Sequence, residues 1–259
     1  MTDITSQGIF DVVVSLLVAT LYGIVAWTII NRSVSRRARM PNQGFAVWWW
    51  GLAALTGVGA AWRVVLWFTT PSVPVYMAYT LSVLLMIMIA FAGMMYYFLY
   101  LWSGRELLWA PLSLFYLGMY VFFVYYIQLQ APLGYDAQGS MQFANDLSDS
   151  PLSTAVGLLL LVPPIIGAAL YLGLLRKAKD RLLRFRIGIV ASSILVWFLV
   201  LLGSSLGDVR EAYPWWAYVS RAIAAIAAAL TLIAYRPPPV VQRWLKLDMA
   251  PKAEHSVDM

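Results

Sequence analysis

The chain has no cysteine, and its one histidine, His255, lies four residues from the C-terminus. Disulfide bonds, thiol nucleophiles and thiolate metal ligands are therefore excluded. Haem ligation, histidine zinc sites and histidine acid–base catalysis all need a histidine inside the fold, and the long apolar runs contain none. These runs also lack paired central aspartates. We therefore expect no metal site and no enzymatic activity.

Charge is also scarce, because only 12% of the 259 residues are charged and 62% are hydrophobic. Soluble domains carry about 25% charged residues. The mean hydropathy of +0.75 adds to this contrast and predicts an integral membrane protein. The N-terminal segment lacks the basic region of a cleavable signal peptide, so we expect the first apolar run to remain as a helix.

Seven apolar runs are long enough to cross a bilayer, which takes about 20 residues per helix. The chain therefore predicts an all-α bundle of seven transmembrane helices over residues 1–240. A short amphipathic and disordered cytoplasmic tail is expected over 241–259. The expected spans are 9–30, 45–68, 75–102, 107–129, 152–175, 187–207 and 215–235.

Basic residues predict the orientation of this bundle. Fifteen of the 18 Lys and Arg residues fall in the linkers after spans 1, 3 and 5 and in the tail, whereas the opposite side holds only Arg210. Lys and Arg are retained on the cytoplasmic side of a membrane. We therefore expect a multi-pass protein of a bacterial inner membrane with its N-terminus outside. The net charge of +6 is explained by this topology and needs no nucleic-acid partner.

The two remaining basic residues, Arg63 and Arg221, lie inside spans 2 and 7 at matching depth below the outer surface. An arginine so close to the interface can snorkel to the headgroups. Small residues flank both positions, however, as at Ala60 and Ala224, and small residues are typical of helix contacts. We therefore expect both guanidinium groups to face the bundle interior.

A buried charge needs a partner, and two acidic positions are close enough in depth. Asp11 near the outer end of span 1 and Asp208 beyond span 6 predict Asp11–Arg63 or Asp208–Arg221 pairs, with Glu211 also nearby. Complete pairing would be structural. Incomplete pairing would leave an electropositive pocket for an anionic, partly apolar ligand. Its predicted ligand-binding residues are Arg63, Arg221, Asp11, Trp62, Trp67, Tyr76, Tyr79, Trp216 and Tyr218.

Proline and small residues suggest further features of the spans. Pro163 and Pro164 lie in the middle of span 5, where proline removes a backbone donor, and they predict a kink or hinge. Two rows of small residues predict close helix contacts or a homo-oligomer interface. These rows are Ala53, Gly57 and Ala61 in span 2, and Ala224 and Ala228 in span 7.

The segment "YYFLYLWSGRELLWAPLSLFYLGMYVFFVYYI" (96–127) and the acidic loop that follows resemble the seven-span membrane module of bacterial sensor kinases. The resemblance covers about a quarter of the chain and implies a sensor. No kinase follows the spans, so it also implies a separate signalling partner on the basic inner loops.

Microbial rhodopsins share the predicted topology, but their retinal is bound by a lysine in helix 7. All four lysines here lie in the cytoplasmic linker or tail, at 177, 179, 246 and 252. Covalent retinal is therefore excluded, whereas a non-covalent lipid, quinone or carotenoid remains compatible. The sequence favours a receptor-like protein that binds a small ligand from outside. An anion or small-molecule transporter and a structural subunit of a membrane complex remain the alternatives.

Overall fold

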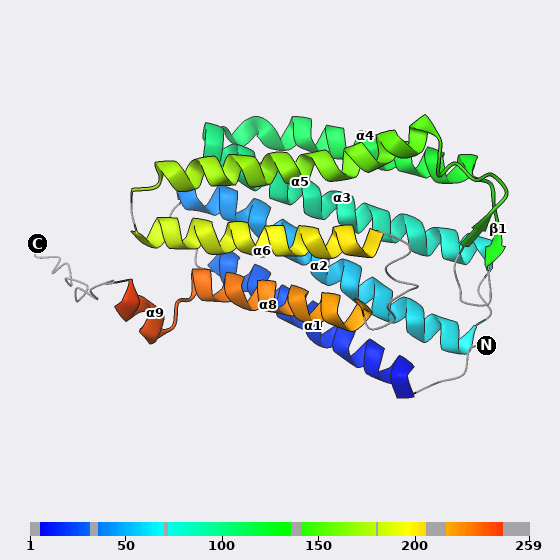
Figure 1. Ribbon diagram of the computed structural model, residues 1–259, viewed down its shortest axis with the longest axis horizontal. Helices are drawn as coiled ribbons and strands as arrows, with labels where there is room; N and C mark the ends of the chain where they lie inside the picture. Colours follow the sequence, from blue (N-terminus) through cyan, green and yellow to red (C-terminus); the bar gives the residue numbers. More distant parts are fainter. Residues whose placement is uncertain are drawn as a thin grey trace, which may run out of the picture.

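The computed structural model describes residues 6–31, 36–69, 72–135, 141–179, 181–205 and 216–245. Within these ranges the side chains of several helix residues, among them Pro163, Pro164 and Trp216, lie outside the description. The described part is almost entirely helical and forms one elongated bundle (Figure 1). The all-α class expected from the sequence is confirmed.

Seven helices of 20 residues or more make up this bundle in the described part of the chain. They are α1 (Ser6–Asn31), α2 (Arg36–Phe68), α3 (Val73–Ser103), α4 (Trp109–Leu129), α5 (Pro151–Lys177), α6 (Arg181–Ser205) and α8 (Trp216–Tyr235). Six of them contain a candidate membrane span by length and composition, namely α1, α2, α3, α4, α6 and α8. The chain is thus a multi-pass helical membrane protein.

The helices close into a ring with one helix outside it. Successive contacts run from α1 to α2, α3, α5, α6, α8 and back to α1. α4 packs against α3 and is not part of this ring. The buried face of α4 repeats every three to four residues, at Tyr116, Met119, Phe123 and Tyr126. The turn after α3 and the junction of α5 with α6 lie at one end of the bundle with α9 (Pro239–Trp244), which we call the basic end, and the opposite end carries a small hairpin (Figure 1).

Helix ends follow local sequence signals. α3 ends at Gly104, whose positive φ of 69° suits a residue without a side chain. α5 begins after Ser150, whose Oγ accepts a hydrogen bond from the Ser153 backbone N–H. α2 and α6 start nine and six residues before the expected spans. These first turns are rich in arginine, so a search for apolar residues stops short of them although the backbone is already helical.

The loop after α4 contains strands that the sequence analysis missed. β1 (Pro132–Tyr135) pairs antiparallel with β2 (Met141–Phe143), and a register irregularity lies between Pro132 and Gly134. These strands are only four and three residues long, too short to show a clear alternation of apolar and polar residues. No pattern in the sequence therefore predicted the hairpin.

A very close helix contact joins α2 to α3, and it uses glycines that the sequence analysis did not select. A Cβ on Gly93 would lie 2.6 Å from the Gly44 carbonyl oxygen, and one on Gly51 would lie 2.7 Å from the Ala90 Cβ. The expected ridge on α2 makes an intrachain contact only in part: Ala53 packs against the core, whereas Gly57 has no neighbour within 4 Å of its Cβ position and Ala61 is exposed. Helical spacing identifies a row of small residues but not the direction it faces.

The expected row in span 7 is confirmed. Ala224 and Ala228 of α8 are buried at 4% and 0% exposure. α8 contacts both α6 and α1, and small side chains let it approach both. After α8 the chain forms a further short helix, α9, over Pro239–Trp244.

Candidate functional site

Asp11 of α1 accepts hydrogen bonds from both arginines of the spans. The Arg221 Nη1 donates to the Asp11 Oδ1 over 2.8 Å, and the Arg63 Nη1 donates to the other carboxylate oxygen. The two guanidinium groups come from α8 and α2, which flank α1 in the ring. We call Asp11, Arg63 and Arg221 the outer charge cluster.

The three residues meet because they lie at one depth. Each is five residues from the end of its helix, and the three helix ends lie at the same end of the bundle. At 1.5 Å per residue the cluster lies about 7.5 Å inside those ends. Ser15, one turn further along α1, donates to the Asp11 backbone oxygen rather than to its carboxylate. Both carboxylate oxygens therefore remain for the arginines.

The charges of the cluster do not cancel, since two guanidinium groups share one carboxylate and leave a net charge of +1. The side chains are partly accessible, with exposed fractions of 31% for Arg63, 18% for Arg221 and 16% for Asp11. Each guanidinium has five N–H donors, and one from each side chain goes to Asp11. Chemically, such a group can hold a second anion beside Asp11.

The aromatic side chains predicted to wall the pocket form two separate groups instead of one wall. Trp62 stacks on Tyr79 with ring centroids 4.7 Å apart, and Tyr76 meets both rings edge-on at the α2–α3 boundary. Tyr218 contacts Phe10 between α8 and α1, and its ring centroid lies 6.0 Å from the Arg221 Cζ. Phe10 was missed because a phenylalanine at a helix end carries no distinctive pattern.

Of the other predicted site residues, only Trp67 has a side chain that the structure describes. Trp67 is partly buried one turn beyond Arg63 and forms no ring pair with another described side chain. Asp208, Glu211 and the Trp216 side chain lie outside the described residues, as do residues 246–259 with His255. The backbone of α5 stays helical through Pro163 and Pro164.

Outside the spans, one acidic residue of the loop before α5 has a clear local partner. The Ser148 backbone N–H donates to the Asp146 Oδ1 over 2.9 Å, and this hydrogen bond lowers the pKa of the Asp146 carboxyl. Asp146 is exposed, so this interaction orders the loop but does not extend the outer charge cluster.

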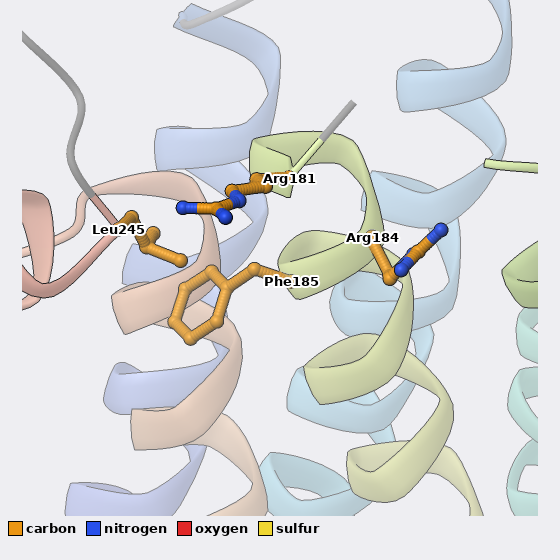
Figure 2. Close-up of a pocket in the computed structure, with 4 residues that line it drawn as sticks. All are labelled: Arg181, Arg184, Phe185 and Leu245. Atoms are coloured by element: carbon orange, nitrogen blue, oxygen red, sulfur yellow. The ribbon is translucent and has the colours of Figure 1, made fainter. Parts of the chain in front are cut away.

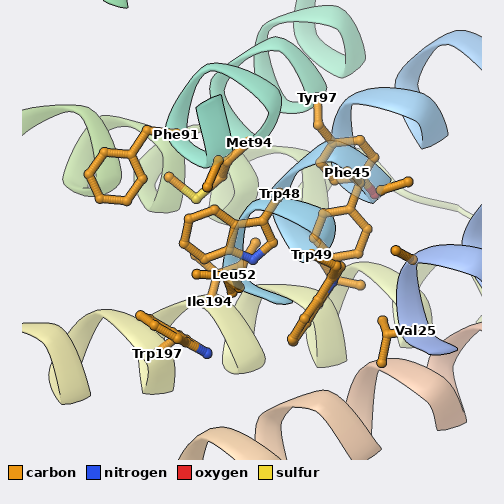
Figure 3. Packing of buried hydrophobic residues seen from close by; sticks show 14 of the residues in the cluster. Val25, Phe45, Trp48, Trp49, Leu52, Phe91, Met94, Tyr97, Ile194 and Trp197 are labelled. Carbon is orange, nitrogen blue, oxygen red and sulfur yellow. The ribbon is translucent and has the colours of Figure 1, made fainter. Parts of the chain in front are cut away.

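A layer of large aromatic side chains fills the bundle below the outer charge cluster. Tyr22 lies 11 residues after Asp11, about 16 Å deeper along α1, and accepts a hydrogen bond from Trp197 Nε1 over 3.3 Å. Trp48 packs between Phe91 and Trp197, with centroid distances of 5.8 Å to each (Figure 3). We call Tyr22, Trp48, Trp49 and Trp197 the aromatic layer; all four are buried.

Nearer the basic end of the bundle, hydroxyl groups pair with each other inside the core. Tyr97 and Tyr171 place their hydroxyl oxygens 3.2 Å apart, and Phe45 stacks between Tyr97 and Tyr235. Tyr235 also donates to Asn42 over 3.4 Å. The aromatic run around Tyr97 thus packs against other described side chains.

Two hollows lie away from the predicted site. One, of about 470 Å³, follows the α1–α2 surface between Leu16 and Trp50 and is almost wholly apolar. The other, of about 310 Å³, lies at the basic end and is lined by Arg181, Arg184, Phe185 and Leu245. No group of three or more His, Cys, Asp or Glu side chains in the described ranges is arranged to hold a metal ion.

Comparisons with known proteins give no relative for this chain. No protein-family model, no curated protein and no solved structure matches it.

Proposed function

We propose that the chain spans the cytoplasmic membrane seven times, with its N-terminus outside and its C-terminus inside. α5 supplies the seventh span, because its 27 residues are long enough and its sequence is strongly apolar. The orientation rests on the distribution of the basic residues along the sequence. The turn after α3 and the linker between α5 and α6, which carry seven of them, lie at the same end of the bundle (Figure 1). The outer charge cluster then lies in the outer leaflet and the hairpin lies outside.

Cysteine labelling tests this orientation without a background signal, since the natural chain has no cysteine. Asp149→Cys lies in the loop before α5 and Arg105→Cys in the turn after α3, and both positions are exposed. A membrane-impermeant maleimide should label Asp149→Cys in intact cells and Arg105→Cys only after permeabilisation. The reverse pattern would show that the protein is inserted the other way round.

We further propose that the chain is a receptor-like protein that binds a small anion at the outer charge cluster. This proposal rests on the excess of positive charge at the cluster, since two guanidinium groups from two other helices share one carboxylate. Arginine binds carboxylate and phosphate through paired N–H donors. The Tyr218 ring beside Arg221 favours an anion that also has an apolar part, such as an aromatic carboxylate.

A ligand bound there would bridge helices that are distant in sequence. α1, α2 and α8 meet at the outer charge cluster, and α8 continues through Tyr235 toward α9 at the basic end. A ligand that changed the distance between α8 and α2 would therefore also move the inner end of α8, where we place the signalling partner. An effect of this kind requires that the ligand bind two bundle arrangements with different affinity.

The buried core favours a receptor over a transporter. The aromatic layer and the Tyr97–Tyr171 pair close the interior between the outer charge cluster and the basic end. A transported anion would need a polar route there, and charged side chains normally mark such routes. In proteoliposomes we expect uptake of radiolabelled benzoate no faster than in protein-free vesicles; faster, saturable uptake would favour transport.

Anion binding itself can be measured by calorimetry and thermal unfolding in nanodiscs of neutral lipid, with benzoate, acetate and inorganic phosphate as probes. Benzoate should bind the natural protein and raise its unfolding temperature. Arg63→Gln and Arg221→Gln should each weaken binding at least about tenfold, which corresponds to about 1.4 kcal/mol. Arg105→Gln, at the opposite end of the bundle, is the matched control and should bind normally. Equal binding by all four proteins would contradict the proposal.

A further inference from the structure

The hollow at the basic end of the bundle combines positive charge with an apolar wall. It has a volume of about 310 Å³ and lies between the start of α6 and the residue that follows α9. Figure 2 shows Arg181 and Phe185 extending from one side of α6 toward Leu245, with Arg184 on the other side of the helix. The spacing of four residues places Arg181 directly above Phe185 on this side.

The two arginines differ in how firmly they are held. Arg184 donates from Nε and Nη2 to the Ala178 carbonyl oxygen at the end of α5, over 3.2 and 2.8 Å. This fixes its stem and leaves three of its five N–H donors for another acceptor. Arg181 is exposed, and no carboxylate of the described residues forms an ion pair with it. Both groups are therefore able to bind an anion.

The surrounding sequence makes this end strongly positive. Residues 176–186 contain six basic side chains and one acid, Asp180, which lies outside the described residues. The candidate span of α6 begins at Arg181 itself, so the arginines lie at the membrane boundary. Phe185, one turn further into the span, and Leu245, only 7% exposed, form the apolar part of the hollow.

A positive charge at the membrane boundary with apolar side chains just inside it matches one kind of ligand. A free phosphate would be bound by the arginines but would gain nothing from the Phe185 ring or the Leu245 side chain. A phospholipid of the inner leaflet has an anionic headgroup at the boundary and an acyl chain directly below it. Basic pockets at the cytoplasmic ends of transmembrane helices suit such headgroups. We propose that this hollow is a specific site for an anionic phospholipid.

The phosphate lies against Arg181, and the first part of an acyl chain lies against Phe185 and Leu245. Because Leu245 follows α9 directly, a lipid in this site ties α9 to α6. The site is independent of the outer charge cluster, which lies at the other end of the bundle.

Native mass spectrometry of the full chain tests the proposal, with phosphatidylglycerol and phosphatidylcholine offered at equal concentration. One phosphatidylglycerol should stay bound in preference to phosphatidylcholine. Arg181→Gln should reduce its retention at least about fivefold, because the charge-assisted contact to the phosphate is lost. Arg105→Gln removes the same charge from the same end of the bundle outside the hollow and should retain the lipid normally.

Three results would overturn the proposal. Equal retention of the two lipids would show that the hollow has no headgroup preference. An equal loss in Arg181→Gln and Arg105→Gln would show a general attraction of the surface. Displacement of the lipid by millimolar inorganic phosphate would identify a free-anion site instead. Within the described residues Arg181 forms none of the hydrogen bonds that hold α6 to its neighbours, so Arg181→Gln should fold; an unchanged unfolding temperature in lipid-free detergent confirms this.

Discussion

Replacing Asp11 with asparagine is expected to lower the free energy of unfolding by about 3 kcal/mol, because it leaves two arginines without a counter-charge in the outer half of the bundle. Asp11 is the acceptor for both guanidinium groups, so the change alters a net charge of +1 to +2. The asparagine keeps the shape of the side chain and one carbonyl oxygen. The loss therefore reports charge and not packing. It can be measured by SDS titration in mixed micelles, followed by tryptophan fluorescence.

The arginine variants should behave differently and supply the internal comparison. Arg63→Gln or Arg221→Gln leaves one arginine paired with Asp11, so each should cost only about 1 kcal/mol. Asp149→Asn, an exposed acid of the loop before α5, is the matched control and should unfold like the natural protein. If Asp11→Asn were no less stable than Arg63→Gln, the two arginines would not depend on Asp11, and the shared pairing would be contradicted.

The second large effect is expected at the contact between α2 and α3. Gly93→Ala places a Cβ 2.6 Å from the Gly44 carbonyl oxygen and 2.8 Å from a methyl group of Val47. The carbonyl belongs to the backbone of α2 and cannot turn away, so the two helices must move apart. We expect a loss of about 2–3 kcal/mol in the free energy of unfolding, as for other overpacked interiors. The same SDS titration measures it.

Two further variants make this prediction specific. Gly57→Ala lies on α2 with open space around its Cβ position and should change stability by no more than about 0.5 kcal/mol. Gly51→Ala meets the Ala90 Cβ at 2.7 Å, so adding Ala90→Gly should restore part of the loss. Gly93→Ala cannot be relieved by one such change, because its nearest obstacle is the Gly44 backbone carbonyl oxygen. Equal stability of Gly93→Ala and Gly57→Ala would show that the helices are not in close contact.

The proposed anion site and the proposed lipid site can be tested independently of each other. Loss of benzoate binding in Arg63→Gln tests the end of the bundle that holds Asp11, and loss of phosphatidylglycerol in Arg181→Gln tests the basic end. Each variant also serves as a control for the other site, because the Arg63 and Arg181 positions lie at opposite ends of the bundle. A variant that lost both ligands would be misfolded.

The membrane class, the all-α fold and the approximate bounds of the helices follow from the sequence alone. The reason is that the length of an apolar run, the end of a helix at Gly104 and the start of one after Ser150 are all local properties of the chain. The depth of Asp11, Arg63 and Arg221 follows as well, because the rise per residue is constant along a helix. The sequence therefore predicted that these charges lie at one level, and it named Asp11 among the partners.

The tertiary structure decided which helices meet and which faces they turn to each other. The rotation of a helix about its axis and its choice of neighbours depend on the packing of the whole bundle. For this reason Asp11 takes both arginines although the sequence suggested separate pairs, and Gly44, Gly51 and Gly93 make the close contact that Gly57 does not. The hollow beside Arg181 and Leu245 joins residues 64 positions apart, and only the packing of α6 near α9 creates it.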